Sequence, residues 1–167
     1  MEKSVNYQEW LKTMPELFTG DALWKMVVYR YALFLGDLSW HDVTKLMNDR
    51  RTIGLSEQLY EAVGSVGANI SEGYSRSSGK DRARFYEYAL GSARESRGWY
   101  YDGRFVLGEE VATHRMQFLT QIIRLLLTIT PEERTRTIRD EEAEYRVDSQ
   151  PLLETLLEQA PLPEMNT

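Results

Sequence analysis

The sequence predicts an all-α fold: an antiparallel, up-down-up-down four-helix bundle with an N-terminal arm and an acidic C-terminal tail. Four segments repeat apolar residues at three- and four-residue steps, the spacing that places side chains on one face of a helix. No segment of useful length alternates apolar and polar residues as a half-buried strand would. The expected division is residues 1–20 for the arm, 21–130 for the bundle and 131–167 for the tail.

The first two helices are delimited by capping and helix-breaking residues. Asp21 is a typical N-cap residue, and the apolar face that follows it is expected to end near Gly36. Residues 39–51 are predicted to be a connector. The second helix is expected to begin near Gly54 and to end in the loop 73–79, which contains two glycines and three serines.

The third helix is predicted over residues 80–107 and the fourth over 111–129. Gly108 separates them, and Pro131 is expected to end the fourth helix because proline lacks the amide that a helix needs. The tail is expected to pack loosely. Four leucines predict a short amphipathic helix within it: Leu152, Leu153, Leu156 and Leu157.

The charge and cysteine content restrict the possible partners and the compartment. Residues 131–167 contain four arginines against ten acidic residues, which accounts for the whole net charge of −6. The chain has no cysteine, so disulfides and thiolate metal sites are excluded and a reducing compartment is favoured. No apolar run approaches the ~20 residues of a membrane span, and no signal peptide is recognisable. We therefore expect a cytoplasmic protein with no membrane partner.

Catalytic signatures are missing, so the sequence predicts a protein that is not an enzyme and has no catalytic residue, metal or cofactor. Di-metal carboxylate bundles place histidine three residues after glutamate, whereas His114 follows Glu110 by four. The segment from Gly73 to Lys80 is not a phosphate-binding loop, because Asp81 stands where the magnesium-binding hydroxyl is needed. Assembly and binding remain as the expected modes of action.

Polar residues occur at positions of the second and third helices where core residues are expected. They are Asn69 and Glu72 in the second helix, and Ser92 and Glu95 in the third. A buried unpaired carboxylate costs several kcal/mol, so these side chains are expected to be paired between two closely packed helices. One interpretation is a close helix crossing with a satisfied polar network; the other is a ligand-binding or nucleic-acid-binding surface.

A run of basic residues with interleaved aromatic residues follows the second helix. Arginine and lysine beside stacking aromatic rings are typical of proteins that bind phosphates and unpaired bases. A solvated helix face would have a similar composition, so both interpretations stand. The candidate nucleic-acid-binding residues are Arg76, Lys80, Arg82, Arg84, Arg94 and Arg97.

The sequence resembles the 23S rRNA-intervening-sequence protein family, also called the S23 family. The resemblance rests on residues 54–59 (GLSEQL), 65–74 (SVGANISEGY) with Arg76 and Ser78, and 84–95, which ends in ALGSARE. It covers about residues 21–130. Its signature positions in this chain include Asn69, Glu72, Gly73, Gly91, Ser92 and Glu95.

The resemblance implies a bacterial four-helix-bundle protein that assembles into a homopentameric ring. A related fold serves as the accessory protein of diversity-generating retroelements, which binds a reverse transcriptase and nucleic acid. We therefore expect a homo-oligomeric, pentameric module that binds RNA or DNA, accessory to an RNA-containing or reverse-transcriptase-containing complex. The alternative is a structural or adaptor protein with a protein-facing surface that includes the tail leucines. In a third possibility, the acidic tail masks the basic face of its own chain.

Overall fold

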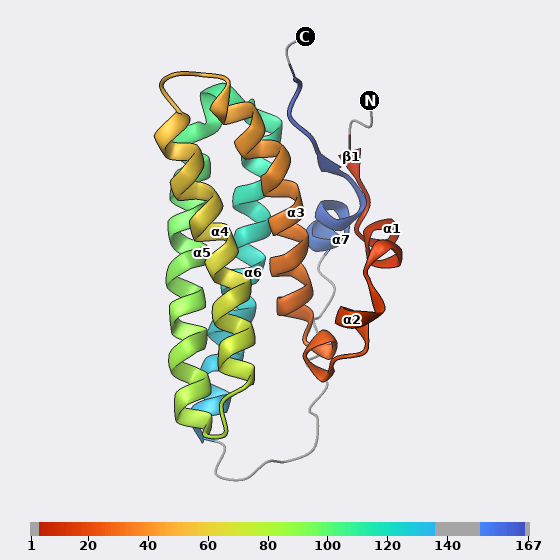
Figure 1. Cartoon of the computed structure of the whole chain (residues 1–167), viewed down its shortest axis with the longest axis vertical. Coiled ribbons are helices and arrows are strands. Elements are labelled where there is room, and N and C mark those ends of the chain that lie inside the picture. Colours follow the sequence, from red (N-terminus) through yellow and green to blue (C-terminus); the bar gives the residue numbers. More distant parts are fainter. Residues whose placement is uncertain (1–3, 136–150, 166–167) are drawn as a thin grey trace.

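The computed structural model describes residues 4–135 and 151–165, and within them the fold is all-α, as predicted. Four long helices form the body of the molecule and lie side by side (Figure 1). They are α3 (Val27–Met47), α4 (Ile53–Tyr74), α5 (Gly79–Leu107) and α6 (Glu109–Thr135). Short connections join them, so neighbours in the sequence are neighbours in space.

The prediction of a connector over residues 39–51 was wrong for residues 39–47, because α3 continues to Met47; residues 48–51 do connect α3 to α4. Leu38, Val43 and Leu46 prolong its buried face, and their burial outweighs the ~1 kcal/mol cost of Gly36 inside a helix. Asp21 caps a separate 3-10 turn, η1 (Ala22–Lys25), by accepting a hydrogen bond from the Leu23 amide.

The prediction that Pro131 ends the fourth helix was also wrong, because α6 continues to Thr135 with the proline inside it. The last turns carry buried side chains, among them Ile129 and Glu133. Glu133 accepts a hydrogen bond from Arg82 of α5 at 2.6 Å, which holds this end of α6 against the body. Pro131 itself is exposed, so its ring displaces no packed neighbour.

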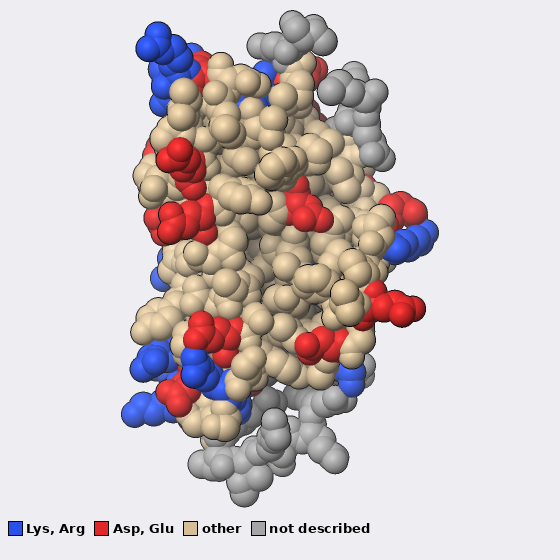
Figure 2. Space-filling model, in the orientation of Figure 1, with Lys and Arg blue, Asp and Glu red and all other residues tan. Residues whose placement is uncertain are grey.

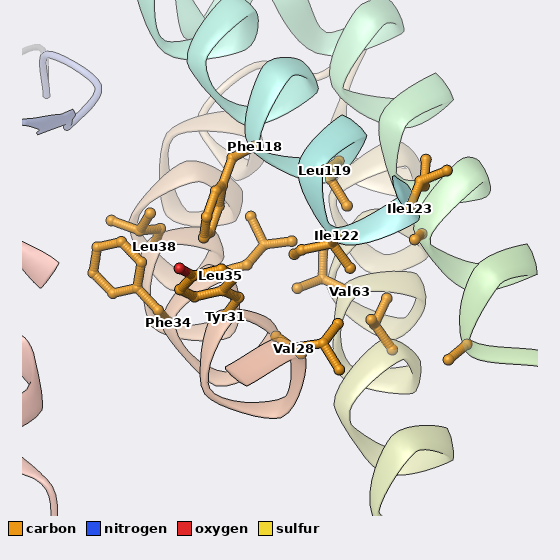
Figure 3. Packing of buried hydrophobic residues seen from close by; sticks show 14 of the residues in the cluster. Val28, Tyr31, Phe34, Leu35, Leu38, Val63, Phe118, Leu119, Ile122 and Ile123 are labelled. Atoms are coloured by element: carbon orange, nitrogen blue, oxygen red, sulfur yellow. The ribbon is translucent and has the colours of Figure 1, made fainter. Parts of the chain in front are cut away.

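The hydrophobic core lies between the long helices. Figure 3 shows side chains of α3, such as Phe34 and Leu35, facing Phe118 and Ile122 of α6, with Val63 of α4 beside them. The rings of Phe34 and Phe118 pack edge to face with centroids 5.9 Å apart. Because these five side chains are almost wholly buried, the core fixes the relative positions of three helices.

Both terminal segments pack together against one side of the body, beside α3 and α6 (Figure 1). The N-terminal segment contains β1 (Ser4–Val5), α1 (Tyr7–Thr13) and α2 (Glu16–Thr19); the C-terminal one contains α7 (Pro151–Glu158) and β2 (Ala160–Pro161). The two strands are antiparallel, with Ser4 opposite Pro161 and Val5 opposite Ala160.

The described part of the tail does not pack loosely, contrary to the prediction. The short helix that the leucines predicted is present as α7, and Leu153 and Leu156 are each only 4% exposed. The side-chain amide of Asn6 also donates a hydrogen bond to the Glu158 carbonyl. The remainder of the predicted acidic tail, residues 136–150 and 166–167, lies outside the described residues, as do residues 1–3 of the predicted arm.

Among the helices formed by residues 4–135 and 151–165, none combines the length and the apolar character that crossing a membrane requires.

Candidate nucleic-acid interface

The turn between α4 and α5 is held by a cap and a close helix contact. The Ser78 hydroxyl accepts a hydrogen bond from the Asp81 amide and so caps α5. A Cβ atom on Gly73 would lie 2.7 Å from the Tyr86 ring and 2.9 Å from the Cβ atom of Phe85. Only glycine allows α4 and α5 to approach this closely, so Gly73 sets the spacing at this end of the body.

Basic and aromatic side chains gather at this turn. Arg76, Lys80 and Arg84 are exposed, and the guanidinium carbons of Arg76 and Arg84 lie 4.6 and 5.6 Å from the centre of the Phe85 ring. Tyr74 and Tyr88 are exposed nearby in sequence, and Tyr88 packs edge to face on Phe85. We call these six residues the turn cluster: Tyr74, Arg76, Lys80, Arg84, Phe85 and Tyr88.

Two of the six predicted nucleic-acid-binding residues are engaged inside the protein. Arg82 is only 14% exposed; it bonds Glu133 and donates to the carbonyls of Arg76 and Ser77 at 3.0 and 3.1 Å. Arg97 is half-buried and donates a hydrogen bond to Thr120 at 3.1 Å. Both residues therefore hold the fold together, and their role in binding nucleic acid stays a prediction.

Arg94 is exposed but lies apart from the turn cluster. Ten residues of helix separate it from Arg84, which corresponds to ~15 Å along the axis. Of the predicted basic run, only Arg76, Lys80 and Arg84 are therefore both exposed and close together.

The signature positions do not form the sheltered network that the sequence predicted. Glu95 is exposed, and the half-buried Asn69 donates to the Ser65 carbonyl of its own helix at 2.8 Å. Ser92 is half-buried, while Glu72 is exposed and forms an ion pair with Arg76 one turn later. The expected shelter of Glu95 between the two helices was wrong, because its side chain is exposed, and Asn69 is only half-buried.

The glycines of α4 and α5 differ in what they face. Gly67 faces α3 rather than α5, since a Cβ atom on Gly67 would lie 3.7 Å from that of Ala32. Gly64 and Gly91 face open space, where an added Cβ atom would meet nothing within 4 Å. Of Gly64, Gly67, Gly73 and Gly91, only Gly73 closely approaches the opposite helix of the α4–α5 pair.

Sequence reasoning missed a buried polar cluster on the other side of the body. The guanidinium of Arg115 binds both carboxylate oxygens of Asp42, at 2.8 and 3.1 Å, and the Tyr100 hydroxyl donates to the same carboxylate at 2.8 Å. All three residues are 0% exposed. We call Asp42, Tyr100, His114 and Arg115 the buried arginine cluster.

The buried arginine cluster also binds the C-terminal segment. Arg115 donates to the Pro161 carbonyl at 2.7 Å, and His114 Nε2 donates to the Leu156 carbonyl at 2.8 Å. Arg115 further donates to His114 Nδ1 at 2.9 Å, which requires the neutral ring.

Burial, followed by the charge of Arg115, lowers the pKa of His114 from 6.5 to about 4. Burial likewise raises the pKa of Tyr100 well above 10. The hydrogen bonds from Arg115 and His114 to main-chain carbonyls therefore anchor the C-terminal segment to the body.

The sequence contained a signal for this cluster. Arg115 continues the four- and three-residue steps of the apolar face through Val111, Phe118 and Ile122, so it occupies a core position. Its partner Asp42 was hidden because residues 39–51 were assigned to a connector instead of a helix.

Among residues 4–135 and 151–165, no three histidine, cysteine, aspartate or glutamate side chains converge so as to hold a metal ion.

These features define an all-α protein whose helical body presents one basic, aromatic turn and carries both terminal segments on another side. The family model described as "23S rRNA-intervening sequence protein" matches residues 25–126, so the chain belongs to this family. The turn cluster and the buried arginine cluster lie within the matched residues, whereas α1, α7 and both strands lie outside them.

A solved structure shows the same fold. It is a crystal structure from Bacteroides thetaiotaomicron VPI-5482, described as a protein with unknown function from the S23 ribosomal protein family. The two chains are 24% identical, and the TM-score is 0.59 over 62% of this chain and 98% of the other. No curated protein matches this sequence.

Proposed function

We propose that this protein is a non-enzymatic, homo-oligomeric four-helix-bundle module that binds nucleic acid through the turn cluster. The observation that carries the proposal is the stacking of Arg76 and Arg84 on the Phe85 ring, with Lys80, Tyr74 and Tyr88 exposed within the same turn region of the sequence. The family resemblance supports a pentamer, acting as accessory to an RNA-containing or reverse-transcriptase-containing complex.

The chemistry of the turn cluster suits a flexible, single-stranded ligand. Guanidinium and ammonium groups bind phosphates, while exposed tyrosine rings offer faces on which unpaired bases stack at ~1–3 kcal/mol each. The stacking of Arg76 and Arg84 against Phe85 favours defined side-chain positions before a ligand binds. Three cations are few for one copy, but several copies in one assembly would bind a long polymer with avidity.

The test is a binding titration of single-stranded RNA at several salt concentrations. Replacing Arg76, Lys80 and Arg84 together with alanine should weaken binding and reduce the salt slope by about 2, because single strands contribute ~0.7 per phosphate contact. The matched control replaces Lys12, Arg50 and Arg51, which are also cations but lie away from the turn. Equal loss in both triple variants, or no binding by the wild type at low salt, would overturn the proposal.

The alternative is a structural or adaptor protein with a protein-facing surface and no nucleic-acid binding. Exposed aromatic residues away from the turn favour it, notably Phe105 at 83% exposure. Two of the tail leucines do not supply that surface, because Leu153 and Leu156 face the protein's own body. If this alternative holds, the protein will bind a partner chain but will not bind RNA at any salt concentration.

Masking of the basic surface by the tail is a separate proposal. Residues 151–165 lie against α6 and the N-terminal segment, so masking would have to involve residues 136–150, which lie outside the described residues. Alanine replacement of the acidic residues in 136–150 should then strengthen RNA binding at matched salt. Unchanged affinity would count against masking.

A further inference from the structure

The C-terminal segment over residues 151–165 is held against the rest of the protein largely through its backbone. Strand β1 pairs with β2 of this segment. Main-chain carbonyls are common to every residue type, so bonds to them do not select a particular sequence. We call residues 151–165 the strap, and the surface that binds it the strap site. Four side chains of the strap site donate hydrogen bonds to strap carbonyls: Asn6 to Glu158 at 3.1 Å, His114 to Leu156 at 2.8 Å, Arg115 to Pro161 at 2.7 Å, and Lys45 to Glu164.

Three of these donors are held in place by the rest of the protein. Asp42 accepts two hydrogen bonds from the Arg115 guanidinium, at 2.8 and 3.1 Å. Arg115 in turn donates to His114 Nδ1, which leaves the ring proton on Nε2, the atom that bonds the strap. Asn6 Oδ1 accepts from two amides at the start of α1, so the Asn6 amide group points toward the strap. The strap site is therefore preorganised for a ligand that presents carbonyl groups.

The buried side chains of the strap define what else the site recognises. Leu153 and Leu156 are each 4% exposed, Ala160 is 0% exposed and Pro163 is buried, whereas Leu152 is 44% exposed. The two leucines lie three residues apart on one face of α7, and the chain is extended from residue 160 onward. A short amphipathic helix followed by an extended chain combines two common modes of peptide recognition, a helix in an apolar site and a strand added to a strand.

Charged side chains contribute little to this recognition. The acidic residues of the strap, Glu154, Glu158 and Glu164, are all exposed. Figure 2 shows mostly uncharged residues over the centre of the side on which the N-terminal segment meets α3. Binding at the strap site should therefore depend only weakly on salt, in contrast to binding of phosphates at the turn cluster.

The helical body occurs without a strap in a related fold. The Bacteroides thetaiotaomicron chain is matched over 98% of its length by 62% of this chain, so it has little beyond the shared fold. The match to the family model ends at residue 126, after His114 and Arg115 but before the strap. When the strap leaves, Arg115 keeps both hydrogen bonds to Asp42, so its charge stays paired. We therefore expect the body to stay folded with the strap site open.

We propose that the strap site is a peptide-binding site, which the strap occupies in this structure and which a segment of a partner protein binds when the strap is displaced. The partner segment has leucines three residues apart on a short helix, followed by an extended chain with a small residue and a proline at the spacing of Ala160 and Pro163. This inference goes beyond the proposed function, because it concerns a protein ligand and a side of the molecule away from the turn cluster.

Exchange of the strap in a cleaved full-length protein tests the proposal. A recognition site for a specific protease is placed within residues 136–150, and the folded protein is cleaved there. The strap should then exchange with a fluorescent synthetic peptide of residues 151–167, as measured by fluorescence anisotropy. The uncleaved protein should bind this peptide at least about tenfold more weakly, because its tethered strap competes at about millimolar effective concentration.

Variant peptides test what the strap site recognises. A peptide with Leu153→Asp and Leu156→Asp should bind about a hundredfold more weakly or less, since both leucines are buried. Leu152→Asp is the matched control and should bind about as well as the native peptide, because Leu152 is 44% exposed. A peptide that keeps the four buried residues but changes the exposed ones stands for a partner segment, and should bind within about threefold of the native peptide.

A variant of the strap site tests the bonds to carbonyl groups. Asn6→Asp keeps the oxygen that caps α1 but loses the amide that donates to Glu158, and should weaken peptide binding about three- to tenfold. Gln8→Glu makes the same change of amide to carboxylate on an exposed residue of α1, and should leave binding unchanged. Equal binding by these two variants would contradict the role of the Asn6 amide.

The outcomes separate this inference from the proposed function. A cleaved protein that loses its far-ultraviolet circular dichroism when the strap is removed, or a strap that never exchanges, would show that the strap is a fixed part of the fold and would overturn the proposal. Equally tight binding of the peptide with both leucines replaced, or loss of binding by the partner-type peptide, would also overturn it. RNA binding is judged by its own titration, so the failure of one proposal leaves the other intact.

Discussion

Arg76 of the turn cluster and Arg115 of the buried arginine cluster each pair with a carboxylate, but in opposite environments. Arg76 pairs with Glu72 where their side chains are 44% and 52% exposed, whereas Arg115 pairs with Asp42 where both are 0% exposed. Water screens the first pair, so its loss costs little and its charges remain available to a ligand. Removing one partner of the second leaves a charge without water or a counterion. Burial, more than residue type, therefore separates residues that hold the fold from residues that can bind.

The largest expected effect comes from breaking the buried pair. Asp42→Ala leaves the Arg115 guanidinium buried without its carboxylate, and should lower the free energy of unfolding by about 3–5 kcal/mol. Urea titration measures this change. Asp102→Ala on the surface of α5 is the control and should stay within about 0.5 kcal/mol of the wild type. A similar small effect at Asp42 would mean that the pair is not buried as described.

Acid should weaken the fold through His114, because the unfolded chain binds a proton there more readily than the native ring. With pKa values of 6.5 unfolded and about 4 folded, this contribution to stability is complete above pH 6.5 and is lost as the pH falls toward 4. The loss should reach roughly 3 kcal/mol.

Comparison with a variant isolates the contribution of His114 from that of the carboxylates. In His114→Gln, the side-chain amide can still donate to Leu156 and accept from Arg115, but it does not titrate. Urea titrations at pH 7, 5.5 and 4.5 should show a steeper loss for the wild type. Parallel curves for the two proteins would contradict the depressed pKa.

Gly73 should be the most sensitive glycine of the helical body. Gly73→Ala forces a methyl group against the rings of Phe85 and Tyr86, and should cost about 1–3 kcal/mol. Gly54→Ala is the matched control, since its Cβ atom would meet nothing within 4 Å, and should be neutral or stabilising by up to ~1 kcal/mol. Equal thermal midpoints in these two variants would show that the α4–α5 approach at residue 73 is looser than the structure indicates.

The smallest expected effect on stability is at the turn cluster. Arg76→Ala removes an exposed ion pair and a ring contact, and should change the free energy of unfolding by less than about 1 kcal/mol. Arg82→Ala should cost more, since Arg82 and its partner Glu133 are 14% and 6% exposed. Thermal unfolding of the two variants side by side checks the order, and a larger loss at Arg76 would reverse our division between binding and structural arginines.

Periodicity predicted the helical body well because each long helix buries one apolar face. Periodicity failed where a helix continues past a residue that was expected to end it. Gly36 lies inside α3 and Pro131 lies inside α6, and buried side chains stabilise the turns that follow each of them. The basic run was predicted by composition, but exposure distinguishes Arg84 from Arg82, and exposure depends on Glu133, 51 residues away in the sequence.

Long-range contacts explain the other failures. The docking of α7 depends on Arg115 and His114 binding main-chain carbonyls, which have no sequence signature. The register that turns Glu95 outward depends on how α5 rotates against two neighbours, and a helical repeat alone does not fix that rotation. Such features follow from tertiary packing and are seen only when the helices are placed together.

Native mass spectrometry of the full-length protein with a single-stranded RNA oligonucleotide tests the central claim most directly, since it reports subunit number and bound polymer together. Our account predicts a homo-oligomer that carries RNA, and RNA-free oligomers when Arg76, Lys80 and Arg84 are replaced with alanine. A wild-type protein that remains free of RNA at low salt, or a triple variant that retains it fully, would contradict the account.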